Sequence, residues 1–140
     1  MKKLILILTL SLPFSAIGNA SERIEADVVV FSQNIAPLTT VKINGQLVLT
    51  NSSGLTVYTY DPDQQGTSNC YGGCASVWPP VLVPSGASVN PPLGLTTRQD
   101  GSHQVTYNSH PVYTYVGDQT SEQTNGNGLG GVWHIVIVPN

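Results

Sequence analysis

The sequence predicts a small single all-β domain, sandwich or barrel-like, made of two pseudo-symmetric repeats that each consist of a β-hairpin and a further strand. Only 9% of the residues are charged, whereas the chain contains 14 glycines and 10 prolines, a composition typical of short strands joined by many turns. Beyond residue 20, no segment repeats apolar residues at the 3.6-residue period of a helix. Several blocks also recur at one constant spacing. We therefore expect little helix, with residues 74–77 the best candidate for a helical turn.

Residues 1–20 have the features of a secretory signal peptide. Two lysines precede an apolar run that starts at Leu4, and Gly18 and Ala20 are small residues suited to cleavage before Ser21. No second apolar segment of about 20 residues follows, so we expect no membrane anchor in the mature chain. The sequence therefore predicts a secreted or periplasmic protein after cleavage near Ala20.

The predicted mature chain is acidic. Removal of residues 1–20 leaves three cations against eight carboxylates, a formal net charge of −5 when the histidines are neutral. Such a surface does not attract nucleic acid or anionic lipid. The remaining 120 residues are enough for one domain with a modest core.

An internal repeat organises the chain. Three separate blocks recur at the same spacing of 55 residues. Chance does not account for such agreement, so the chain contains two copies of one unit. Residues 57–60 (VYTY) recur as residues 112–115, Asp63 recurs as Asp118, and residues 77–78 (VW) recur as residues 132–133. The predicted segments are a signal peptide (1–20), an N-terminal extension or strand (21–39) and a two-repeat β domain (40–140), which contains repeat 1 (46–80), an extended Pro-rich connector (81–94) and repeat 2 (95–138).

Each copy is predicted to contain a hairpin, a long polar loop and a closing strand. β-Branched and aromatic residues fill the predicted strands. Asn44-Gly45 and Asp100-Gly101 supply residues that tolerate positive φ and predict two more hairpins. Residues 132–138 are apolar apart from His134, and we expect them to form one unbroken strand in the middle of a sheet or the core. The hairpin strands are residues 46–50 and 55–60 around turn 51–54, and residues 104–107 and 111–115 around turn 108–110.

Cys70 and Cys74 are the only cysteines, and we expect them to form a disulfide. In an oxidising compartment a close cysteine pair is more often a structural bridge than a metal or catalytic site. Gly72 and Gly73 suit a tight bridged loop because they tolerate positive φ. The second copy has glycines at the corresponding place but no cysteine, and a loop this short gains little unfolded-state entropy from closure, so the bridge is expected chiefly to fix local shape.

The ordered blocks resemble a known family. The match includes residues 54–63, 68–74 and 78–80 in the first copy, and residues 100–108, 113–118, 124–126 and 133–134 in the second. Together they resemble the family of secreted bacterial repeats and predicted lipoproteins that carries a Tyr-x-aromatic-x-x-Asp motif, over about residues 40–136. Many members of that family carry a lipid-anchored cysteine, which this sequence lacks. The resemblance implies a family and no biochemical activity.

Six aromatic residues are candidates for ligand binding. The two tyrosines of each copy alternate along a strand, so both face the same side. Such a row forms either a half-buried aromatic face or a platform on which a flat ligand stacks, and the tryptophans have the same two possible roles. The candidates are Tyr58, Tyr60, Tyr113, Tyr115, Trp78 and Trp133. Asp63 and Asp118 are expected to cap the following loops by accepting backbone N–H bonds.

A metal site is the alternative use of the cysteines. A Cys-x-x-x-Cys pair with a distant histidine is the ligand set of copper-handling proteins of the oxidase assembly type, so Cys70, Cys74 and His134 could hold copper or another soft metal. Those proteins have a thioredoxin-like α/β fold, which this sequence does not predict. Asp61 and Asp63 resemble the first half of a calcium loop, but its twelfth position lacks the required glutamate.

The residues favour a non-enzyme. The sequence contains no Gly-x-Ser-x-Gly and no His-Glu-x-x-His motif, and export disfavours a free nucleophilic thiol. We therefore expect an exported binding or scaffold module of the cell envelope, with an envelope protein or small ligand as partner and no cofactor. The alternative is a periplasmic copper-like metal carrier or redox carrier that uses Cys70, Cys74 and a histidine.

Overall fold

The computed structural model describes residues 33–140, which form short strands and two short helical segments. The predicted signal peptide lies outside the described residues. Within residues 33–140, no helix has the length and apolar character needed to cross a bilayer. The elements in chain order are β1 (Gln33–Asn34), β2 (Leu38–Ile43), β3 (Gln46–Asn51), β4 (Tyr58–Tyr60), α1 (Gly73–Val77), β5 (Leu82–Val83), β6 (Ala87–Ser88), β7 (Leu93–Thr97), β8 (His103–Tyr107), β9 (His110–Pro111), the 3-10 helix η1 (Leu129–Gly131), β10 (Trp133–Ile135) and β11 (Ile137–Val138).

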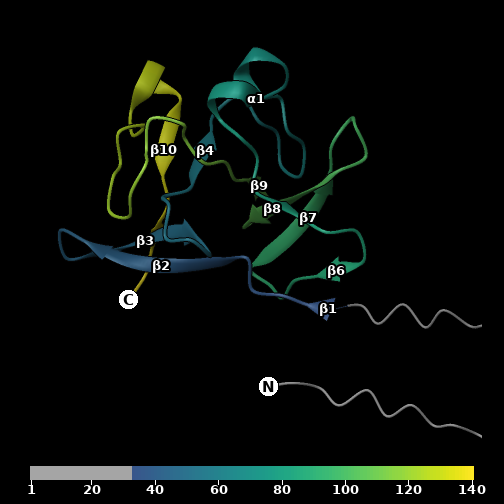
Figure 1. The fold of residues 1–140 in the computed structure, drawn as a ribbon, viewed down its shortest axis with the longest axis horizontal. Coiled ribbons are helices and arrows are strands. Elements are labelled where there is room, and N and C mark those ends of the chain that lie inside the picture. Colours follow the sequence, from purple (N-terminus) through teal and green to yellow (C-terminus); the bar gives the residue numbers. More distant parts are fainter. Residues whose placement is uncertain (1–32) are drawn as a thin grey trace, which may run out of the picture.

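Two equivalent sheets confirm the predicted all-β fold with internal pseudo-symmetry. One has the order β11-β3-β2, and the other has the order β5-β8-β7, with β9 also paired to β8. In the first sheet Leu38 pairs with Asn51, and in the second Leu93 pairs with Tyr107. Figure 1 shows β2 and β3 below β4 and β10, β7 and β8 to their lower right, and α1 beside β4 at the top of the view. Each strand of one sheet thus has a counterpart 55 or 56 residues away in the sequence.

The two repeats exchange their closing strands. β4 of the first copy pairs with β10 of the second, so that Tyr60 lies opposite Trp133. Reciprocally, the closing segment of the first copy pairs with the second copy, because the backbone N–H of Thr114 donates to the carbonyl of Pro79 over 2.8 Å. Tyr58 and Tyr113, which are equivalent residues, bond to each other through both N–H groups over 2.8 and 3.0 Å. The pseudo-twofold axis therefore passes between these tyrosines, and each repeat completes the pairing of the other.

The prediction of a single central strand over residues 132–138 is wrong. The segment divides at Val136, whose carbonyl accepts the N–H of Leu49, and the chain passes there from one sheet to another. β11 lies at a sheet edge, where 43% of Ile137 is exposed. The run is apolar apart from His134, so it carries no sustained alternation that would reveal this change of sheet. The predicted connector likewise contains β5, β6 and the start of β7.

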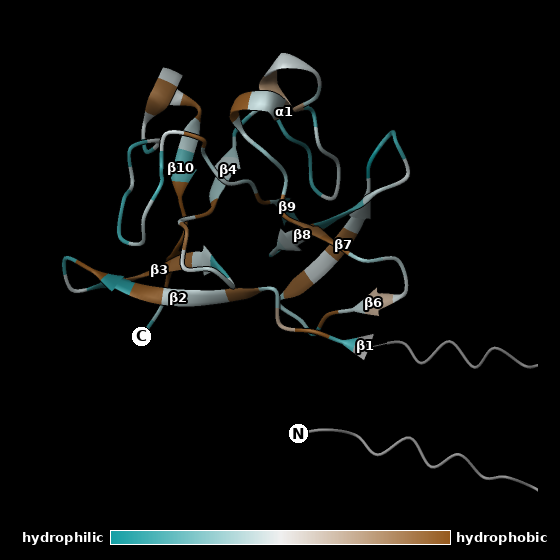
Figure 2. Cartoon of the chain, viewed as in Figure 1, coloured by the Kyte–Doolittle hydropathy of each residue, from teal (hydrophilic) through white to brown (hydrophobic). Residues whose placement is uncertain are grey.

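The interior consists of an aliphatic cluster and an aromatic cluster. Val57 and Val112 are fully buried at equivalent places in the aliphatic cluster, next to Leu49 and Val105. Burial of such a side chain typically contributes about 1.5–3 kcal/mol. Figure 2 shows hydrophobic strand segments bordered by hydrophilic loops, including the loop before β10. The aromatic cluster lies where the repeats exchange strands, and it contains all six aromatic candidates together with the disulfide cysteines.

Candidate functional site

Four aromatic rings form one continuous stack, which we call the aromatic stack. Its order is Tyr60, Trp133, Trp78 and Tyr115. The ring centroids of successive members are 4.2, 3.8 and 4.4 Å apart, with interplanar angles of 15°, 5° and 29°. The two tryptophans are equivalent residues, so the pseudo-twofold axis passes between them. The stack therefore alternates between the two repeats and joins them.

Two further tyrosines cover the edges of the stack. Tyr58 meets Trp78 edge-on with centroids 5.3 Å apart, and Tyr113 meets Trp133 in the same way at 5.3 Å. Stacked and edge-to-face pairs each contribute about 0.5–1.5 kcal/mol beyond the burial of their area. This arrangement encloses both tryptophans.

Burial leaves only two of the six candidate aromatic rings accessible to a ligand. Tyr58 and Tyr113 are completely buried, and the tryptophans are only 5–6% exposed, so none of these four rings offers a face to a ligand. Neighbouring rings cover the faces that a ligand would need. Only Tyr60 and Tyr115, half-buried at the two ends of the stack, reach the surface.

The motif tyrosine of each copy binds the motif aspartate of the other copy. The hydroxyl of Tyr58 donates to Oδ2 of Asp118 over 2.5 Å, and that of Tyr113 donates to Oδ2 of Asp63 over 2.7 Å. The second oxygen of each carboxylate accepts a backbone N–H from the following loop, over 2.7 Å in one copy and 2.9 Å in the other. The acids therefore cap their own loops and also link the two repeats. The sequence did not reveal this link, because a repeat spacing identifies equivalent residues and not contacting ones.

Burial shifts the ionisation of this network. It raises the pKa of Tyr58 and of Tyr113 well above the ordinary range of a phenol, and the carboxylate that accepts each hydroxyl acts in the same direction. Burial also raises the pKa of Asp63 above its ordinary value, although the bonds from Tyr113 and from the N–H of Asn69 oppose that shift. Both phenols are therefore neutral donors at physiological pH.

We expect Asp63→Asn to change how stability depends on pH. Because the folded pKa of Asp63 is raised, its contribution to stability is fully present below the unfolded pKa and is lost as the pH rises through the folded pKa. The free energy of unfolding of the wild type minus that of the variant should therefore fall as the pH rises, measured by urea unfolding between about pH 3 and pH 7.

Asp100→Asn is the matched control for that measurement. Asp100 is exposed, and its pKa is lowered by bonds from Ser102, so its pH trend should have the opposite sign. If the difference in the free energy of unfolding between the wild type and Asp63→Asn stays constant with pH, or rises with it, the pKa of Asp63 is not raised in the folded protein.

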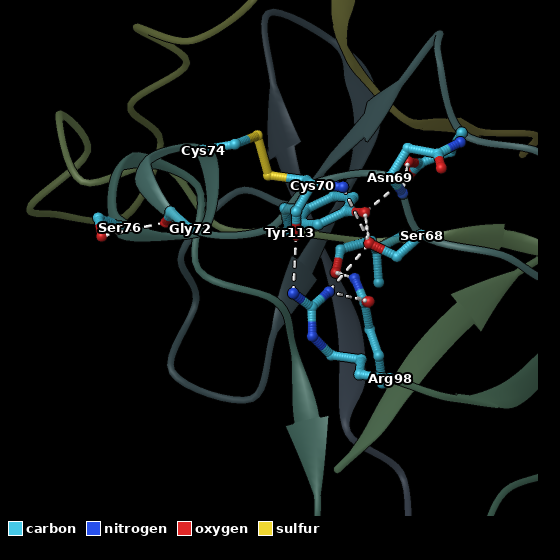
Figure 3. Close-up of a disulfide and its surroundings, with 11 residues drawn as sticks. Ser68, Asn69, Cys70, Gly72, Cys74, Ser76, Arg98 and Tyr113 are labelled. Carbon is cyan, nitrogen blue, oxygen red and sulfur yellow. Dashed lines mark hydrogen bonds between the residues drawn. A yellow bond between two sulfur atoms is a disulfide. The ribbon is translucent and has the colours of Figure 1, made fainter. Parts of the chain in front are cut away.

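A buried arginine ties the disulfide loop to the second repeat. Arg98 is only 6% exposed and donates to the Cys70 carbonyl (2.7 Å), the Ser68 Oγ (3.0 Å) and the Gln104 Oε1 (2.8 Å). Figure 3 shows its guanidinium pointing toward Cys70 and Ser68. The Ser68 Oγ lies 2.6 Å from the Tyr113 hydroxyl, so a chain of polar contacts runs from this cation to Asp63. One weak signal in the sequence pointed to Arg98, which is one of only three lysines and arginines beyond residue 20.

Cys70 and Cys74 form a disulfide (Figure 3). Cys70 is fully buried in the aromatic cluster, whereas Cys74 is half-buried in α1. Asn69 and Asn125 donate to equivalent aspartates, so the structural counterpart of Cys70 is Gly126, one residue beyond the position that the 55-residue offset predicts. A Cβ on Gly126 would lie 2.6 Å from the Trp78 ring, so the second copy has no room for a side chain there.

Replacing both cysteines by alanine is expected to leave the fold intact and to lower the free energy of unfolding by about 2 kcal/mol, the loop-entropy value for so short a loop. The second copy forms its loop without a bridge, which is why we expect folding to continue. Urea unfolding of the oxidised wild type and of the double variant measures the loss. A double variant that does not fold would show that the bridge is essential to the whole domain.

The predicted metal ligands do not converge. The two sulfurs are bonded to each other, and Nε2 of His134 lies 2.9 Å from Oδ2 of Asp61 at an exposed site. Among residues 33–140, no three His, Cys, Asp or Glu side chains form a group that could hold a metal ion. The structure therefore provides no assembled ligand set for the copper alternative or for the partial calcium loop within this range.

A comparison with protein families gives a match in both repeats. Residues 40–82 and 94–137 each match a family described as a secreted repeat of unknown function. The chain belongs to this family. Searches of curated proteins and of solved structures found no match. Each matched segment of this secreted-repeat protein contains one motif tyrosine, one capping aspartate and one tryptophan of the aromatic stack, so the matched unit contains half of the aromatic cluster.

Proposed function

We propose that this secreted-repeat protein is a non-catalytic binding module of the cell envelope, and that its binding surface is the patch formed by Val77, Val116 and the ring of Tyr115. Val77 is 42% exposed and Val116 is 52% exposed. The N–H of Val116 donates to the carbonyl of Val77 over 3.0 Å, which holds the two valines side by side. We call these three residues the valine patch.

A difference between the two repeats carries this proposal. The equivalent bond in the other copy runs from the N–H of Asp61 to the carbonyl of Val132 over 2.9 Å. There the position of Val116 is taken by an exposed, charged Asp61, which contacts His134. Because the same backbone arrangement accepts a charge, folding does not require an exposed valine at position 116. Exposed apolar groups that the fold does not need are typical of interaction sites.

The chemistry of the patch favours an apolar segment of another protein as partner. The exposed aliphatic side chains offer apolar contact area, and the half-buried Tyr115, which precedes Val116 in the chain, offers one hydroxyl for a hydrogen bond. Val77 is the last residue of α1, and the disulfide and the Arg98 bond both hold the loop that leads into that helix. A rigid patch loses little conformational entropy when a partner binds.

Site-specific photo-crosslinking in cells that produce the protein tests this function. A photo-reactive residue at position 116 should capture a discrete partner through aliphatic or aromatic side chains, and Val77→Asp should abolish that product. The matched control is a photo-reactive residue at Leu95, which is 37% exposed on β7. The same products from both positions, or a product that survives Val77→Asp in a folded variant, would overturn the proposal.

A further inference from the structure

We propose that the aromatic stack, together with Tyr58 and Tyr113, is a relay for single-electron oxidation. A one-electron oxidant, such as a metal centre of another protein or a diffusible radical, would take an electron at Tyr60 or Tyr115. The resulting hole would pass through the stacked tryptophans and come to rest as a neutral radical on Tyr58 or Tyr113. This activity goes beyond the proposed binding function and does not depend on it.

The stack has the geometry that electron transfer between rings requires. Successive centroids are at most 4.4 Å apart, and the two tryptophans are almost parallel at 5°. The π systems of such rings overlap, so an electron passes readily from one ring to the next. Indole and phenol rings are also the most easily oxidised aromatic side chains. The half-buried ends reach the surface, while the inner rings are shielded from water.

The two buried tyrosines have the proton acceptors that phenol oxidation requires. A phenol that loses an electron becomes a strong acid and must release its proton. The hydroxyl of Tyr58 contacts the carboxylate of Asp118 at 2.5 Å, and that of Tyr113 contacts Asp63 at 2.7 Å. Each acceptor is therefore in hydrogen-bond contact before oxidation begins.

At Tyr58, loss of the electron is coupled to transfer of the hydroxyl proton. One electron leaves its ring through Trp78 and reduces the oxidant by one unit, the O–H bond breaks, and the proton moves to Asp118. The products are a neutral tyrosyl radical and a neutral carboxylic acid. A returning electron and the same proton restore the phenol.

Each carboxylate uses both of its oxygens as acceptors, one for the phenol of the other copy and one for a loop N–H. An asparagine has only one acceptor oxygen, and its amide nitrogen cannot take a proton. The carboxylate oxygen that accepts the phenol can also take its proton. The same arrangement occurs twice, once at each tryptophan.

Flash photolysis of the full chain with photo-generated tris(bipyridine)ruthenium(III) tests the relay. Transient absorption and electron paramagnetic resonance should show a tryptophan radical that converts into a neutral tyrosyl radical. In the variant with Tyr58→Phe and Tyr113→Phe, the tryptophan radical should form without that conversion. The matched control carries Tyr71→Phe and Tyr107→Phe, outside the stack, and should behave as the wild type does.

A second variant keeps the tyrosines and removes the proton acceptors. With Asp63→Asn and Asp118→Asn, formation of the tyrosyl radical should slow by about 100-fold, as loss of a positioned base predicts. Thermal unfolding establishes that each variant is folded. Three results would overturn the proposal: no tyrosyl radical in the wild type, a tyrosyl signal that depends on Tyr71 or Tyr107 instead, or an unchanged rate without the carboxylates.

Discussion

Trp133→Ala is expected to lower the free energy of unfolding by about 3–5 kcal/mol, the range for removal of a buried tryptophan. Its ring stacks on Trp78 and Tyr60, meets the edge of Tyr113, and is only 5% exposed. The cavity left by the substitution would lie on the pseudo-twofold axis, where neither repeat could fill it alone. By the same argument Trp78→Ala should have a similar effect.

Urea unfolding followed by circular dichroism measures this loss. Leu129→Ala is the control, since Leu129 is 40% exposed and such surface changes usually stay within about 0.5 kcal/mol. The wild type and the tryptophan variants should each unfold in one transition. A loss below about 1 kcal/mol, well under the range for buried tryptophans, would contradict the view that the stack holds the repeats together.

Arg98→Met is expected to cost about 3 kcal/mol, because a buried acceptor left without its donor costs about 1–3 kcal/mol. The variant keeps the length of the side chain but leaves the Cys70 carbonyl and the Gln104 Oε1 without this donor. Removal of a buried charge offsets part of the loss, which is why the expected value is lower than a sum over the bonds.

Arg98→Lys separates charge from geometry. A lysine keeps the positive charge but lacks the planar fork that reaches three acceptors, so it should recover only a small part of the loss. The measurement is urea unfolding of both variants under identical conditions. An Arg98→Met variant as stable as the wild type would show that the network contributes nothing net.

The sequence predicted the features that depend on local chemistry and on repetition. Turn residues identified the β2-β3 and β7-β8 hairpins, α1 appeared at the expected residues, and the family was confirmed by matches in both repeats. The predicted hairpin partner at residues 55–60 is correct only near Thr56, because residues 58–60 pair with β10 instead. The closeness of Cys70 and Cys74 in an exported chain indicated their disulfide. These signals lie within short stretches of the chain, where the conformational preferences of neighbouring residues determine the local structure.

The contacts between repeats could not be predicted in this way. The offset shows that Tyr58 corresponds to Tyr113, but not that the two pair with each other or that each binds the other copy's aspartate. Arg98 contacts residues about 30 positions away, and its sequence surroundings resemble an ordinary surface hairpin. Alternation along a strand placed Tyr58 and Tyr60 on one side, yet only the packing of the second repeat decides which ring is covered.

A pair of double-mutant cycles tests most directly whether the Tyr-x-aromatic-x-x-Asp motif joins one repeat to the other. Tyr58→Phe combined with Asp118→Asn should show a coupling energy of about 1.5–3 kcal/mol, as expected for a buried hydrogen bond to a charged group. Tyr58→Phe combined with Asp63→Asn, the acid of the same repeat, should be additive within about 0.5 kcal/mol. Additive behaviour between Tyr58 and Asp118, with coupling between Tyr58 and Asp63 instead, would contradict the exchange between repeats on which the account rests.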